Sequence, residues 1–76
     1  MADAEETVVK TIRGLLRRRK ATVEVDANAD LYEDLGLDAL ELAELSAKLE
    51  TDLGRDPYSD GQTPRTVADV VDYYNP

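Results

Sequence analysis

Apolar side chains recur at helical spacing in three stretches of this chain of 76 residues. The first stretch predicts a helix over about residues 4–19, with Asp3 as its N-cap and an apolar face made of Val8, Ile12, Leu15 and Leu16. Gly14 lies inside this helix, where glycine costs up to about 1 kcal/mol relative to alanine. We therefore expect a neighbouring helix to pack closely at Gly14.

The second stretch predicts a helix that begins at Asp38 and ends near Leu53. Asp38 and Glu41 have the spacing of a capping box, and Gly54 is suited to a left-handed helix end. Its core face consists of Leu42, Leu45, Leu49 and Leu53, with Ser46 at the edge. Leu40 falls on the opposite face among carboxylates. That position predicts contact with a partner protein.

The remaining segments complete an all-α fold. Residues 20–37 predict an ordered loop that packs through Val23, Val25, Leu31, Tyr32 and Leu35. Residues 55–63 predict a second loop with at most a short helical turn around Tyr58–Gly61. A capping box of Thr66 and Asp69 starts a short closing helix with the apolar stripe Val67, Val70, Val71 and Tyr74. The chain thus predicts one domain over residues 1–76, a small four-helix bundle of three main helices plus a short or irregular third helix.

The loop carboxylates raise the question of a metal site. Asp26, Asn28 and Asp30 have the spacing of the first three ligands of an EF-hand calcium loop. Such a loop requires glycine at its sixth position and glutamate at its twelfth, where this chain has Leu31 and Leu37. We therefore expect a polar turn and no metal site.

The net charge of the chain limits the kinds of molecule that we expect it to bind. The net charge is −8, with six basic and three acidic residues over 1–23 and three basic and fourteen acidic residues over 24–76. An acidic field of this size repels nucleic acid and anionic membranes and favours basic protein partners. The run Arg17-Arg18-Arg19-Lys20 fits a helix C-terminus, where cations complement the helix dipole, better than a docking patch.

Composition also bears on chemistry. The chain has no cysteine and no histidine, and no serine or lysine stands beside a base, so we expect no catalytic residues and no enzyme. No apolar run approaches the length that spans a membrane, which favours a cytoplasmic location.

The segment around the second helix start resembles a known family. Asp34-Leu35-Gly36 followed by Asp38-x-Leu40 is similar to the attachment signature of acyl and peptidyl carrier proteins. The resemblance implies a cofactor site formed by Asp38, Leu40 and a serine between them that receives 4'-phosphopantetheine. This chain has Ala39 at that position, so no cofactor is expected on it. Ser46 and Ser59 are not expected to substitute.

The resemblance also implies a partner surface on the second helix, made of Leu40, Glu41, Ala43, Glu44, Ala47 and Glu50. The implied partners are a phosphopantetheinyl transferase and acyl-loading, condensing or tailoring enzymes. A monomer is expected.

Two functions follow from Ala39. The favoured one is a carrier that holds acyl or aminoacyl thioesters in its serine form, with that serine deliberately replaced here by alanine to hold the unmodified form or to trap a complex. The alternative is a natural carrier-like protein that lost the attachment residue and acts as a non-covalent docking or regulatory subunit. Fatty acid, polyketide and nonribosomal peptide pathways all stay open. The resemblance covers essentially the whole chain and favours a free-standing protein over a module of a larger synthase.

Overall fold

Three helices form in the computed structural model, which describes residues 4–19 and 24–75: α1 (Ala4–Arg18), α2 (Ala39–Leu53) and α3 (Val67–Tyr74). No strand occurs within these residues, although the backbones of Asp30 and Thr66 make one isolated antiparallel bridge. The all-α prediction is confirmed. The predicted cap Asp3 lies outside the described residues, as do Lys20 and Val23.

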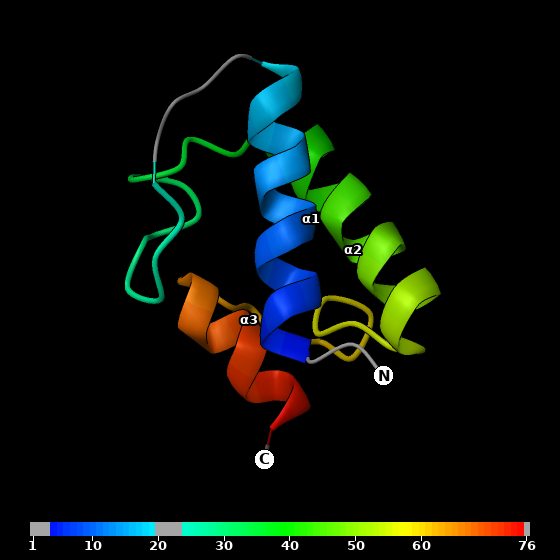
Figure 1. The fold of residues 1–76 in the computed structure, drawn as a ribbon. Coiled ribbons are helices and arrows are strands. Elements are labelled where there is room, and N and C mark those ends of the chain that lie inside the picture. The colour runs from blue at the N-terminus through cyan, green and yellow to red at the C-terminus, as the bar shows by residue number, and fades with distance from the viewer. Residues whose placement is uncertain (1–3, 20–23, 76) are drawn as a thin grey trace.

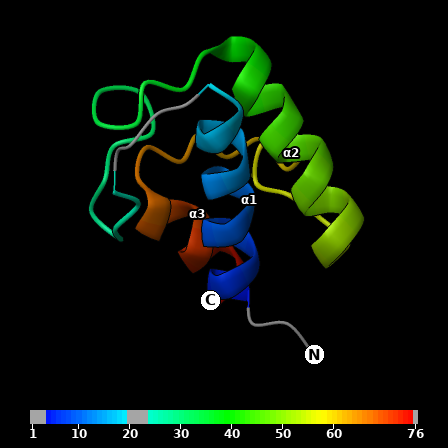
Figure 2. The same cartoon turned by 45° about the horizontal axis from the view of Figure 1, so that its top comes forward.

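The central element is α1, which lies against both other helices, while the backbones of α2 and α3 do not approach each other. Figure 1 shows α2 running antiparallel to α1 on one side and α3 crossing the N-terminal part of α1 on the other. The view in Figure 2 agrees and shows the long loop before α2 covering the side of α1 that α2 leaves open. No helix of the described residues is long and apolar enough to cross a membrane.

The core joins these helices through residues that are almost completely buried. Ile12 and Val8 of α1, Leu45 and Leu49 of α2, and Val67 and Val70 of α3 have at most 1% of their surface exposed. The loop before α2 adds the buried residues Val25, Ala29, Leu31, Leu35 and Leu37. The prediction of an ordered, packed loop is therefore confirmed for residues 24–37. It is wrong for Tyr32, which is 53% exposed.

The expected irregular element between α2 and α3 is a series of turns over residues 57–61. The Gln62 N–H donates to the Pro57 carbonyl at 2.8 Å, and the Gly61 N–H donates to the Tyr58 carbonyl at 3.2 Å. Buried Asp56 fastens this segment to α2, because its carboxylate accepts hydrogen bonds from the hydroxyls of Ser46 at 2.7 Å and Ser59 at 2.8 Å. Both serine hydroxyls are thus engaged in structure.

Gly14 does not have the packing role that the sequence predicted. A Cβ atom built at Gly14 would meet no described atom within 4 Å, so no neighbouring helix requires glycine there. The expectation of close packing is wrong. Gly54 differs, because it ends α2 with φ at 86°, and its N–H donates to the Glu50 carbonyl at 2.9 Å. That backbone conformation favours glycine over residues with a Cβ.

Gly14→Ala should therefore stabilise the protein by about 0.5–1 kcal/mol, the helix propensity difference. Gly54→Ala, the matched control, should destabilise it by about 1 kcal/mol, because alanine resists the left-handed conformation. Urea unfolding followed by circular dichroism measures both free energies. A loss of stability in Gly14→Ala would show that the position is more crowded than the structure indicates.

Candidate functional site

The predicted attachment position lies at the first turn of α2, where a complete capping box fixes the backbone. The Glu41 N–H donates to Asp38 Oδ1 at 2.8 Å, and the Asp38 N–H donates to Glu41 Oε1 at 3.1 Å. Asp38 has extended backbone angles, and α2 starts at the following residue. The capping box and helix boundaries predicted for this segment are confirmed.

Residues 39 and 40 face solvent at this helix start. Ala39 is exposed, and Leu40 has 70% of its surface exposed although its neighbours in the loop, Leu35 and Leu37, are buried. The N–H groups of Ala39 and Leu40 have no acceptor among the described residues. The helix start therefore offers free backbone donors and the positive end of the helix dipole beside a solvent-facing side chain.

The basic end of α1 holds the loop that enters this site. Arg19 Nη1 donates to the Gly36 carbonyl at 2.7 Å and lies 3.4 Å from Glu41 Oε1. Gly36 has φ at 66°, and a Cβ there would lie 3.5 Å from the same guanidinium nitrogen. One arginine thus contacts both the loop before Asp38 and the N3 residue of the capping box.

The predicted partner surface is only partly free. Glu44 pairs with Arg18, and Glu41 is occupied by Arg19 and the cap. The other members of the predicted surface, Ala43, Ala47 and Glu50, are exposed. The interpretation of Arg18 and Arg19 as cations serving the dipole of α1 missed these pairs. The opposite charges at the end of the first helix and on the second helix were visible in the sequence. Which of them form ion pairs, however, depends on how the helices pack.

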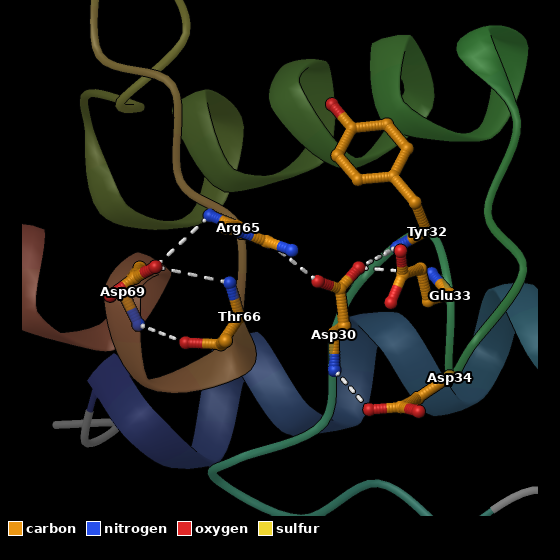
Figure 3. Close-up of polar contacts among 7 residues, drawn as sticks. All are labelled: Asp30, Tyr32, Glu33, Asp34, Arg65, Thr66 and Asp69. Carbon is orange, nitrogen blue, oxygen red and sulfur yellow. Dashed lines mark hydrogen bonds and ion pairs between the residues drawn. The ribbon is translucent and has the colours of Figure 1, made fainter.

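Asp30 organises the loop that leads to the site (Figure 3). Its Oδ1 accepts the N–H groups of Tyr32 at 2.8 Å and Glu33 at 2.9 Å, and its Oδ2 accepts from Arg65 Nε at 2.9 Å. The Asp30 N–H in turn donates to Asp34 Oδ2 at 2.7 Å. Backbone N–H groups thus occupy the carboxylates of Asp30 and Asp34, as in the polar turn that the sequence predicted.

The same loop is joined to the start of α3. The Leu31 N–H donates to the Arg65 carbonyl at 2.8 Å, and the Val67 N–H donates to the Ala29 carbonyl at 3.1 Å. The predicted capping box of α3 is present, with the Asp69 N–H bonded to Thr66 Oγ1 at 3.2 Å and the Thr66 N–H bonded to Asp69 Oδ2 at 3.1 Å. The pairing of Asp30 with Arg65 was not predicted, because the two residues are 35 positions apart in the sequence.

The model of the family described as the phosphopantetheine attachment site matches residues 6–74. The match covers most of the chain, so this protein belongs to the phosphopantetheine-dependent carrier protein family. Carrier domains of this family are not themselves catalysts, which agrees with the expectation of no enzyme.

The residues present do not fit covalent attachment of the family's prosthetic group at position 39. The exposed position and the free N–H groups at the start of α2 suit a phosphodiester. Attachment, however, requires a hydroxyl oxygen, and Ala39 has none. The hydroxyls of Ser46 and Ser59 are bound to Asp56.

Acid should lower the free energy of unfolding of this protein, because it protonates carboxylates that are hydrogen-bonded in and next to the same loop. Hydrogen bonds from the Glu33 N–H and from Arg65 hold the pKa of Asp30 below its ordinary value, and those from the Arg65 and Thr66 N–H groups do the same for the pKa of Asp69. A depressed pKa stabilises the fold above the ordinary value of about 3.9, and this stability is lost as pH falls through the lower folded value.

We expect Asp30→Asn to lower the melting temperature at pH 7 by several degrees and to make that temperature less sensitive to acid between about pH 5 and pH 2. Asp52→Asn is the matched control, since Asp52 is exposed and its side chain makes no hydrogen bond to the loop among the described residues. Thermal unfolding across a pH series measures both variants. Equal acid sensitivity in Asp30→Asn and the parent chain would contradict the role given to Asp30.

Proposed function

We propose that this chain is one carrier domain over residues 1–76 with its attachment position at residue 39, in a form that cannot be modified. In its serine form it would hold acyl or aminoacyl intermediates as thioesters on 4'-phosphopantetheine. The observation that carries the proposal is the exposed residue 39 between Asp38 and Leu40 at a capped helix start, within the part of the chain that matches the family.

The proposed partner surface consists of Leu40, Glu41, Ala43, Glu44, Ala47 and Glu50. Its partners would be a phosphopantetheinyl transferase and the acyl-loading, condensing or tailoring enzymes of a fatty acid, polyketide or nonribosomal peptide pathway. We propose that it works as a monomer in the cytoplasm, away from nucleic acid and membranes, since its net charge of −8 opposes binding to polyanions.

Ala39 itself favours a second candidate function. A natural carrier-like protein with alanine at this position would act as a non-covalent docking or regulatory subunit. The partner surface would then be the functional part of the molecule. The residue encoded at position 39 in the natural gene distinguishes the two proposals.

Ala39→Ser should make the protein a substrate for phosphopantetheinyl transfer, because the Asp38 cap and exposed Leu40 need no rearrangement. The measurement is intact mass after incubation with coenzyme A and a transferase of broad specificity. The expected result is one added phosphopantetheine on Ala39→Ser and none on the parent chain. Asn75→Ser, which creates an exposed serine at the end of α3, is the matched control and should stay unmodified.

Two outcomes would contradict the proposed site. No added mass on a folded Ala39→Ser variant would mean that residue 39 is not the attachment position. Added mass on the parent chain would mean that another residue is.

Leu40→Ala in the Ala39→Ser background should lower kcat/KM for the transfer by about tenfold at low and high salt alike. The reason is that an apolar side chain buried at the interface with the transferase carries much of the cost of truncation. Glu44→Lys should act mainly at low salt, since charges at a rim chiefly affect association. Thr51→Ala, at the far end of the same exposed face, should leave kcat/KM unchanged. A larger effect of Thr51→Ala than of Leu40→Ala would move the partner surface away from the helix start.

A further inference from the structure

The basic side chains of the described residues divide into two groups. Four have a partner: Arg18 and Arg19 pair with glutamates, Arg65 pairs with Asp30, and Arg55 lies over the ring of Tyr73. The other four, within residues 4–19 and 24–75, have no ion pair or hydrogen bond through their side chains: Lys10, Arg13, Arg17 and Lys48. Free cations are unexpected in a chain with seventeen carboxylates.

All four unpaired cations line one groove between α1 and α2. Lys10, Arg13 and Arg17 follow one another at intervals of three and four along α1, and therefore share a face of that helix. Lys48 approaches from α2, which lies beside α1 (Figure 2). We call the groove bounded by these four residues the basic groove.

The acidic residues of the basic groove lie at its two ends and compensate its positive charge only in part. Glu44 lies at the end near the start of α2, where it is paired with Arg18. Glu6 and Asp52 lie in the first turn of α1 and the last turn of α2, at the other end of the groove, because the two helices are antiparallel. The middle of the groove therefore carries net positive charge in a protein of net charge −8.

Gly14 is part of the same groove and adds no side chain to it. It lies one residue after Arg13 and three before Arg17, and the space above its Cα is free of described atoms. Glycine in the middle of a helix lowers stability, and nothing in the packing of α1 explains it here. An open space between the cations gives it an explanation.

We propose that the basic groove binds an acidic helical segment of a partner protein, with carboxylates placed against Lys10, Arg13, Arg17 and Lys48 and the backbone of that segment over Gly14. Charge complementarity selects this occupant. Nucleic acid is disfavoured because its phosphate charge repeats along the whole strand, whereas the cations of the groove lie in its middle and acidic residues lie at both ends. The groove is separate from Ala39 and Leu40, so the proposal goes beyond the carrier function and does not depend on modification of residue 39.

The test uses the full chain and a fluorescein-labelled peptide that has glutamates on one face of an alanine-leucine helix. Fluorescence anisotropy at about 0.01 M ionic strength, where the Debye length is about 30 Å, should show saturable binding. A peptide with glutamine in place of glutamate should bind at least tenfold more weakly. Absence of saturable binding by the acidic peptide would overturn the proposal.

The variants distinguish the groove from a general charge effect. Arg13→Glu should weaken binding about tenfold, and Arg17→Lys should retain most of it, since a single cation suffices there. The double variant Gln62→Glu and Thr63→Glu changes net charge as much as Arg13→Glu, but on an exposed loop outside the groove. It should weaken binding less than twofold, and a loss equal to that of Arg13→Glu would overturn the proposal.

Gly14→Gln tests the open space without changing the charge. Glutamine is a good helix former, so the variant should fold, while its side chain should weaken peptide binding about threefold by occupying the groove. Unchanged affinity would show that the peptide does not lie over Gly14.

A second copy of this chain is the other occupant that the basic groove could have. Sedimentation of the protein alone tests for it. Self-association that Arg13→Glu abolishes would assign the groove to a second copy and overturn the assignment to a partner protein.

Discussion

The rest of this small fold depends on the hydrogen bonds that the carboxylate of Asp30 accepts. It satisfies two N–H groups of the loop before α2 and ties that loop to Arg65 at the entry to α3. The loop supplies five of the thirteen buried apolar residues that form the core within residues 4–19 and 24–75. Since the backbones of α2 and α3 do not approach each other, residues of this loop complete the core that both helices share with α1. An irregular segment can fill that role only if its backbone groups are paired, and Asp30 provides the pairing.

The same loop also determines how the candidate site is presented. Buried Leu35 and Leu37 anchor the chain on either side of Gly36, and Arg19 holds the Gly36 carbonyl. Asp38 then caps α2, and the next two residues face solvent. A capped helix start held on both sides gives a rigid position from which an attached group or a partner contact would project.

Charge is organised across the helices of this carrier protein rather than within them. The arginines at the end of α1 neutralise Glu41 and Glu44 near the start of α2, so the exposed Leu40 stands beside paired charges. Exposed ion pairs contribute little stability and exchange readily for other partners. A basic partner enzyme would therefore compete with Arg18 for Glu44, whereas contact with Leu40 needs no such exchange.

The sequence by itself determined the three helices, both capping boxes and the glycine that ends α2, because these features depend on residues three or four apart and on intrinsic backbone preference. It also indicated the family through the segment around Ala39. Only the tertiary structure decided which distant groups meet: Asp30 with Arg65, Arg18 with Glu44, and the exposure of Tyr32. It also showed that Gly14 borders an open groove instead of a packed helix. Such contacts depend on how helices and loops lie in space, which periodicity along a single chain does not specify.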